Sequence, residues 1–335
     1  MFTHSNSNSI VIAYTDNMET MARSASKKLE SLGVNSITLS RVEMIRFPSG
    51  EVKPKIIENV SRKEVFIFFD FNGKPNEDIW NFLLTIDALH LAGAERITPV
   101  VPYLPYLRQD RKDEPRVPIS AARLIRSIEQ CSSVKRLITI DMHADQLQAV
   151  FTIPVDNLPG RVVFSSWAKE RFAGGLNNLV AVAPDFGSAK RVRKLAADIG
   201  SDVKVSILEK ERDRNGVEIH NIIGATVFGK TCIINDDMID TGGTLVKAIQ
   251  ALYQHGAKSV MASASHPVFS PKDGTTAYEK LVEAGAEIVV TDSLITEPHD
   301  WLTVLPLHPY LAHVIFQHVT CDGSVSKLIT EGLPK

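Results

Sequence analysis

Short apolar segments alternate with amphipathic helical patterns along the whole chain of 335 residues. This alternation is what most limits the fold, because buried parallel strands read as apolar runs and each needs a crossover helix to reach the next strand. A first series of expected strands covers 10–14, 36–39, 65–69, 97–101 and 137–140. A second series covers 179–183, 203–208, 231–234, 259–262 and 287–290. The pattern predicts an α/β fold of two successive domains, each a largely parallel sheet flanked by helices.

Helical spacing of apolar residues marks the connections between these strands. It predicts helices near 18–32, 80–92, 120–128, 192–199 and 245–252. Gly33 and Gly256 follow the first and the last of them, where a glycine commonly ends a helix. No Ser/Gly-rich linker separates the halves, and the boundary is expected near 154–160.

Composition narrows the functional classes. The apolar fraction is 44% and the charged fraction 23%, as in ordinary globular proteins. A net charge of -2 provides no overall attraction to nucleic acid or to an anionic membrane, so neither is an expected partner. Cys131, Cys232 and Cys321 lie far apart without a C-x-x-C, which argues against a disulfide framework and a zinc site. Residues 1–9 lack the features of a signal peptide, and a cytoplasmic protein is expected.

The segment 231–256 carries the strongest local signal. An apolar strand leads into N-D-D-M-I-D-T-G-G-T at 235–244, and an amphipathic helix follows. Backbone N–H groups at such a strand-to-helix turn attract a phosphate, and the glycines allow close approach. Asp236 and Asp237 can accept hydrogen bonds from ribose hydroxyls. The segment therefore predicts a sugar-phosphate site, against the plainer alternative of a solvated loop.

Other charged clusters follow expected strands, where ligands of open α/β sheets collect. They lie at 46–51, 108–113, 141–146, 185–188 and 208–216. The 185–188 cluster opens a basic helix whose N-terminus suits an anion, with Asp185 available to Mg²⁺. His143 between acids can help to hold a divalent ion. Taken alone, the remaining clusters are equally well explained as turns and solvated loops.

The order of the clusters is more informative than any one of them. Along the chain they read F-P-S-G-E, Y-L-R-Q-D-R-K, D-M-H-A-D-Q, A-P-D-F-G-S, K-E-R and D-D-M-I-D-T-G-G-T. This succession resembles that of the ribose-phosphate pyrophosphokinase family, also called phosphoribosyl pyrophosphate synthetases. The resemblance extends from about residue 47 to residue 326, most of the chain.

The resemblance implies a fold, a reaction and an assembly. It implies two phosphoribosyltransferase-like (Rossmann-like) domains: 1–157 on the ATP side and 158–310 on the ribose-phosphate side, with 311–335 packing back on the first. The reaction would be Mg²⁺-dependent transfer of the β,γ-diphosphate of ATP to the anomeric hydroxyl of ribose 5-phosphate, giving phosphoribosyl pyrophosphate and AMP. The protein would be a homo-oligomer built from dimers, a hexamer being one such assembly.

The resemblance also assigns roles to residues. The ATP-binding set is Phe47 and Glu51 from a neighbouring subunit with Arg108, Gln109 and Asp113. The catalytic pair is Lys210 and Arg212, and the metal positions are His143 and Asp185. The pyrophosphate loop is Asp185, Phe186, Gly187 and Ser188. The ribose-phosphate set is Asp236, Asp237, Asp240, Thr241, Gly242, Gly243 and Thr244.

Some positions depart from the family pattern. Ser49 stands where an acidic or amide residue is usual, and Ser188 replaces a glycine. Glu211 lies inside the basic loop and carries the same sign of charge as a polyphosphate. Asn235 replaces an apolar residue before the two acids. Ser61 stands where a regulatory arginine is common, which leaves allostery by phosphate and ADP open.

Two alternatives to this function stay open. The same chemistry acting on ADP-ribose would produce its pyrophosphate for NAD rebuilding, as in some divergent relatives. A catalytically silent regulatory subunit is the second alternative, although the retained Lys210, Arg212, His143 and Asp185 argue against it.

Overall fold

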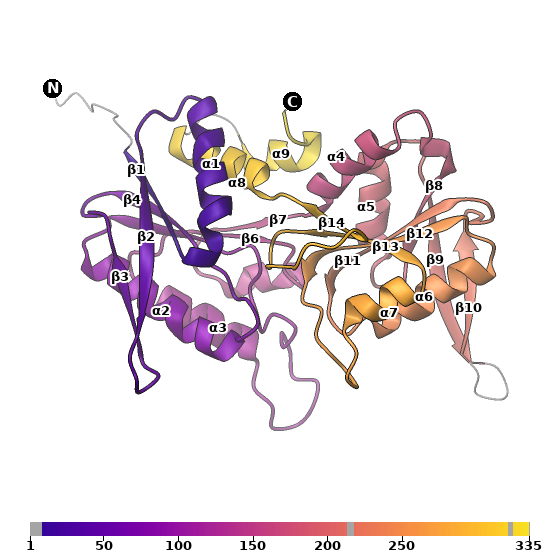
Figure 1. The fold of residues 1–335 in the computed structure, drawn as a ribbon, viewed down its shortest axis with the longest axis horizontal. Coiled ribbons are helices and arrows are strands. Elements are labelled where there is room, and N and C mark those ends of the chain that lie inside the picture. The colour runs from indigo at the N-terminus through magenta and orange to yellow at the C-terminus, as the bar shows by residue number, and fades with distance from the viewer. Residues whose placement is uncertain (1–8, 213–217, 321–323, 335) are drawn as a thin grey trace. The chain divides into compact units, whose positions relative to one another are not determined.

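The computed structural model describes residues 9–212, 218–320 and 324–334, and for 210–212 and 218–220 the backbone alone. The chain divides into two compact units. The first consists of Met1–Pro159 with Leu307–Lys335, and the second is Gly160–Pro306. Figure 1 labels their helices and strands.

The first unit is built on a seven-stranded sheet of order β3-β2-β1-β4-β5-β6-β7. All neighbouring strands are parallel except the β2–β3 hairpin. The strands are β1 (Ile10–Tyr14), β2 (Ile37–Arg46), β3 (Val52–Ile56), β4 (Glu64–Phe68), β5 (Arg96–Val100), β6 (Leu137–Ile140) and β7 (Val155–Leu158). Every residue of β1 is buried, which explains its uninterrupted apolar sequence.

Helices cover both faces of this sheet. They are α1 (Glu19–Ser31), α2 (Pro75–Leu91), α3 (Ser120–Glu129), α8 (His308–Thr320) and α9 (Val325–Glu331), with short 3-10 turns η1 (Asp16–Met18) and η2 (Asp145–Val150). Helix α8 packs against α1, so the C-terminal segment completes the layer that α1 begins (Figure 1). Helices α2 and α3 lie on the opposite face.

The second unit repeats this arrangement. Its sheet has the order β10-β9-β8-β11-β12-β13-β14, which is the first order with seven added to each strand number. The strands are β8 (Leu179–Ala183), β9 (Lys204–Arg212), β10 (Glu218–Gly224), β11 (Thr231–Ile239), β12 (Ser259–Pro267), β13 (Ala286–Thr291) and β14 (Leu302–Leu305). The helices are α4 (Arg161–Arg171), η3 (Leu176–Asn178), α5 (Ala189–Ile199), α6 (Gly243–Gln254) and α7 (Ala277–Glu283). Helices α4 and α5 pack together, as do α6 and α7 (Figure 1).

The expected fold class is confirmed: two mostly parallel sheets with flanking helices. Every expected strand has a counterpart. The differences concern edges and lengths: the antiparallel edge strands β3 and β10 and the parallel edge strands β7 and β14 were not anticipated. The half-exposed sequences of β3, β7 and β14 lack a long apolar run. Strand β11 continues to Ile239 instead of ending near 234, because β12 pairs with it as far as Pro267.

Among the residues that the structure describes, no helix is both long and apolar enough to cross a bilayer.

A polar clasp ties α8 to the edge of the first sheet. Asp156 on β7 accepts hydrogen bonds from Arg136 Nη1 to both carboxylate oxygens, each at 3.0 Å. Its Oδ2 also lies 2.7 Å from His318 Nε2 on α8. The Asp156 side chain is only 11% exposed, so the carboxylate depends on these partners in place of water.

We expect Asp156→Ala to lower the free energy of unfolding by about 2 kcal/mol or more, because it leaves a half-buried guanidinium and an imidazole without their shared acceptor. Urea denaturation followed by circular dichroism measures the change. The control is Lys327→Ala, which removes an exposed pair with Glu331 and should cost close to nothing. Equal losses for the two variants would show that the clasp does not stabilise the unit.

Candidate functional site

The second unit places two loops at the topological switch point of its sheet. Strands β8 and β11 are neighbours there, and the chain leaves β8 toward β9 but leaves β11 toward β12. The 185–188 loop follows β8, and the acids of β11 with the 240–244 loop follow β11. Crevices at such a point, beyond the carboxyl ends of the strands, are where open α/β sheets bind ligands.

Strand β11 carries its acids beyond its neighbour β8. It pairs with β8 only from Thr231 to Ile234, whereas β12 accompanies it further. Asp236 and Asp237 are called the acid pair here. They therefore lie near the carboxyl end of a central strand, beyond the part that pairs with β8. The apolar residues Cys232, Ile233 and Ile234 anchor that strand in the core.

The 240–244 loop depends on glycine. Gly242 adopts the left-handed region at φ 74°, which glycine tolerates without steric cost, and α6 begins at the next residue. A Cβ at Gly242 would also lie 3.2 Å from the Cβ of Ala277, which opens α7. The loop therefore packs closely on α7 while the unpaired N–H groups of the first turn of α6 remain available to an anion.

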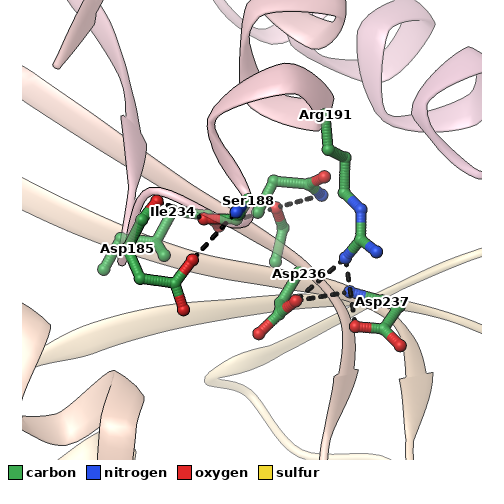
Figure 2. Close-up of polar contacts among 8 residues, drawn as sticks. Asp185, Ser188, Arg191, Ile234, Asp236 and Asp237 are labelled. Carbon is green, nitrogen blue, oxygen red and sulfur yellow. Dashed lines mark hydrogen bonds and ion pairs between the residues drawn. The ribbon is translucent and has the colours of Figure 1, made fainter. Parts of the chain in front are cut away.

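A single arginine nitrogen bridges the acid pair (Figure 2). Arg191 Nη1, from α5, donates to Asp236 Oδ1 at 2.9 Å and to Asp237 Oδ1 at 3.1 Å. Asp236 Oδ1 also accepts the backbone N–H of Asp237 at 2.9 Å. The two acids are unequal: the Asp237 side chain is 6% exposed and that of Asp236 is 34% exposed.

Burial and the neighbouring Asp237 carboxyl raise the pKa of Asp236 to about 7. Arg191 and the backbone N–H of Asp237 act in the opposite direction, since both stabilise the ionised form. Two carboxylates this close favour sharing one proton. The charge of the acid pair near neutral pH therefore depends on Arg191 and on any ligand that donates hydrogen bonds to it.

The 185–188 loop is a tight turn before α5. Asp185 Oδ1 accepts the backbone N–H of Ser188 at 2.8 Å, and Ser188 Oγ donates to the Asp185 carbonyl at 3.0 Å. Figure 2 shows both contacts beside the acid pair. Phe186, within this turn, is exposed. The serine that replaces a family glycine thus closes the turn with its own hydroxyl, and the Asp185 carboxylate stays at the surface.

Asn235, the unexpected polar residue of β11, has partners within the sheet. Its Nδ2 donates to Ser263 Oγ at 3.0 Å, and Ser263 Oγ donates to the Ile234 carbonyl at 2.9 Å. Both side chains are buried. The polar residue at 235 is therefore paired with a serine on the neighbouring strand β12. Burying the two side chains costs little stability because they form hydrogen bonds.

Two of the expected nucleotide positions occupy the tip of the β2–β3 hairpin in the first unit. Phe47 is half exposed, with Lys53 Nζ 5.5 Å from its ring centroid. Ser49 Oγ donates to Glu51 Oε2 at 2.8 Å, so the hydroxyl at this unusual position orients the glutamate. The aromatic face and the carboxylate lie at the surface of the unit.

The remaining positions of the first unit follow β5 and β6. Arg108, Gln109 and Asp113 are exposed and lie between β5 and α3. Ser120 Oγ, at the start of α3, donates to Gln109 Oε1 at 2.5 Å. His143 is exposed after β6, in a loop held by the hydrogen bond from the Met142 N–H to Asn157 Oδ1 at 2.8 Å.

No group of three or more His, Cys, Asp or Glu side chains in the described part of the chain is arranged to hold a metal ion by itself. His143 belongs to the first unit and Asp185 to the second. Lys210 and Arg212 lie on β9, and their side chains fall outside the described residues.

The structure thus brings together the acid pair, the 240–244 loop and the 185–188 loop. Arg191 is a site residue that the sequence did not single out. The sequence indicates a basic helix whose N-terminus suits an anion, and no sequence signal shows which of its basic residues turns toward the acid pair, 45 residues further along the chain.

We expect Asp236→Asn to change how stability depends on pH. The folded-state pKa of about 7 exceeds the usual aspartate value of about 3.9. The folded protein therefore holds a proton that the unfolded chain has released, and the contribution of Asp236 to the free energy of unfolding falls as pH rises from about 4 to about 7. An amide at this position does not titrate, so the stability of the variant relative to wild type should increase with pH over that range. Urea denaturation at a series of pH values measures it, and a constant difference would contradict the raised pKa.

Comparisons with known proteins show which family this chain resembles. The sequence model of the N-terminal domain of ribose phosphate pyrophosphokinase matches residues 10–131, and that of the phosphoribosyl transferase domain matches residues 163–292. The ribose-phosphate pyrophosphokinase of Campylobacter jejuni subsp. jejuni is 41% identical over 310 residues, 92% of this chain and 94% of that protein. The one from Helicobacter hepaticus is 42% identical over 295 residues, 87% of this chain and 92% of that protein.

A solved structure extends the similarity to the backbone. The crystal structure of phosphoribosylpyrophosphate synthetase from Mycobacterium smegmatis matches with a TM-score of 0.81 and 31% sequence identity, covering 94% of this chain and 100% of that chain. Both family domains, the sequence identity and the shared architecture lead to one conclusion: the chain belongs to the ribose-phosphate pyrophosphokinase family of diphosphotransferase enzymes.

Proposed function

We propose that the protein transfers the β,γ-diphosphate of ATP to the anomeric hydroxyl of ribose 5-phosphate, giving phosphoribosyl pyrophosphate and AMP. The observation that carries the proposal is the pairing of a carboxylate pair with a glycine-bearing helix N-terminus at the switch point of the second unit. Such a site offers acceptors to sugar hydroxyls and N–H donors to a phosphate within one crevice.

The second unit would bind the acceptor. The 5-phosphate would lie on the N–H groups of Thr241, Gly242, Gly243 and Thr244, at the start of α6. Asp236, the more exposed member of the acid pair, would accept hydrogen bonds from the ribose hydroxyls. Asp237 and Asp240 would complete the negative side of the crevice. Contacts at both the phosphate and the hydroxyls would hold the acceptor in one orientation, and such positioning is a main contribution to rate.

The first unit would bind ATP. Phe47 offers an aromatic face to adenine and Glu51 a carboxylate, both at a hairpin tip. By family resemblance these two would serve the site of a neighbouring subunit, whereas Arg108, Gln109 and Asp113 would serve their own. The proposed active species is therefore a homo-oligomer built from dimers.

The proposed metal position at Asp185 suits Mg²⁺. Mg²⁺ is usually held by one or two carboxylates together with substrate phosphates and water, and not by a complete cage of protein ligands. Asp185 offers a surface carboxylate with one oxygen already fixed by the Ser188 N–H, and His143 is an exposed imidazole in the other unit. Bound Mg²⁺ would neutralise phosphate charge during transfer.

The transfer itself requires no covalent enzyme intermediate. The anomeric oxygen attacks the β-phosphorus in line with the leaving AMP oxygen, and positive groups stabilise the charge that spreads over the diphosphate. Lys210 and Arg212, on β9 next to the switch point strand β8, are the proposed sources of that charge.

ADP-ribose is a second candidate acceptor, favoured by an aromatic stack beside the 240–244 loop. His299 and Trp301 stack with ring centroids 4.5 Å apart, and Trp301 stacks on Tyr278 at 5.2 Å. Tyr278 follows Ala277, whose Cβ lies against Gly242. An exposed ring such as that of His299 suits the base of an acceptor that extends beyond ribose 5-phosphate.

An acceptor assay tests the proposed function. The protein is incubated with ATP and Mg²⁺ and either ribose 5-phosphate or ADP-ribose, and AMP release is followed. We expect AMP with ribose 5-phosphate, since its sugar and phosphate match the acid pair and the loop. AMP with ADP-ribose alone would replace the proposal by the second candidate. AMP with neither would favour a catalytically silent subunit.

We expect Lys210→Ala to lower kcat by about two orders of magnitude or more, with little change in the KM for ATP, because its charge is needed mainly in the transition state. Steady-state kinetics with ATP as the varied substrate measures both constants. Lys204→Ala, at the start of the same strand, is the matched control and should retain activity. An unaltered kcat in Lys210→Ala would remove this residue from the mechanism.

A further inference from the structure

Arg191 connects the two loops of the switch point. It lies three residues after Ser188, on the first turn of α5, so its position is determined by the 185–188 loop. Its Nη1 reaches across to both carboxylates at the end of β11 (Figure 2). A loop on one strand and an acid pair on the next are thus joined through one side chain.

We propose that Arg191 is a positioning residue for the acceptor, anchored by the buried Asp237 and orienting the partly exposed Asp236 toward the ribose hydroxyls. The proposal rests on the proposed function, and it gives different roles to two acids that the sequence makes equivalent. Asp237 would not contact the sugar. It would hold the guanidinium that orients Asp236.

Burial supports this division. With 6% of its side chain exposed, Asp237 has almost no surface to offer a ligand, and a buried carboxylate requires a partner of opposite charge. Arg191 supplies that partner from α5, itself 27% exposed. Asp236 is the member of the pair that a sugar hydroxyl can reach, because 34% of its side chain faces the surface.

Geometry supports the orienting step. Asp236 Oδ1 accepts two hydrogen bonds, one from Arg191 Nη1 and one from the Asp237 backbone N–H, both at 2.9 Å. Two donors from different directions fix the plane of the carboxylate. A fixed acceptor binds a hydroxyl more tightly than a mobile one, since less freedom is lost on binding.

Arg191→Met tests the proposal, because methionine keeps much of the apolar stem and removes the guanidinium. We expect the KM for the acceptor to rise about tenfold or more, in keeping with loss of a hydrogen bond to a charged group, with the KM for ATP within about twofold of wild type. Arg191→Lys should restore part of the acceptor affinity, since it keeps the charge but not the planar donor group. Arg193→Met is the matched control: it removes an exposed arginine from the same helix and should leave both constants unchanged.

Asp237→Asn provides a second, independent variant that preserves side-chain shape. We expect it to raise the acceptor KM in the same direction, and we expect Arg191→Met with Asp237→Asn to cost less than the sum of the two single changes, because both act through one contact. Circular dichroism checks that each variant is folded. If Arg191→Met does not fold, Arg191→Lys and Asp237→Asn carry the same test.

The outcomes separate the two proposals. Wild type that releases no AMP with ribose 5-phosphate overturns the proposed function; the variants are then compared with ADP-ribose, and inactivity with both acceptors overturns the positioning role as well. Active wild type with an unchanged acceptor KM in Arg191→Met overturns the positioning role alone. A rise in the KM for ATP with no change for the acceptor also overturns it, since Arg191 would then act on the diphosphate.

Discussion

Two carboxylates at the end of a central strand impose the constraint on which the rest of the site depends. Asp236 and Asp237 are neighbours at the carboxyl end of β11, one of them buried, and their mutual repulsion would protonate or displace one of them. Arg191 opposes this repulsion by donating from one nitrogen to an oxygen of each carboxylate. Because α5 begins directly after the 185–188 loop, the contact of Arg191 with the acids also restrains the position of that loop.

The two units share a strand order, yet their switch points are built differently. In the first unit the corresponding strands are β1 and β4, and the carboxylate that follows β4 is Asp70. It accepts hydrogen bonds from Thr15 Oγ1 at 3.0 Å and Asn17 Nδ2 at 2.9 Å. The hydrogen-bond donors to this carboxylate are thus neutral side chains. The second unit has a left-handed glycine and an acid pair at the equivalent place. Two sheets with the same strand order can therefore carry different side chains at their switch points. The difference here lies in a few residues at the carboxyl ends of two strands in each sheet.

Much of the fold was predictable because it depends on local patterns. Apolar runs such as 10–14 and 179–183 are buried on both faces, and their composition indicates a parallel sheet without any knowledge of neighbours. The hairpin strand β3 and the edge strand β14 were not predictable in this way, because half-exposed strands carry a mixed sequence. The full length of β11 was missed for another reason: its acidic end is held in the sheet by pairing with β12.

The sequence by itself determined which loops carry charged residues and glycine. The order of these loops along the chain indicated the family. Those features follow from residue type and spacing along the chain. Only the tertiary structure decided that Asp236 is partly exposed while Asp237 is buried, that Asn235 contacts Ser263, and that Arg191 turns toward the acids. The physical reason is distance along the chain: 45 residues separate Arg191 from Asp236, and no local pattern encodes which of several cations on α5 reaches a carboxylate on another strand.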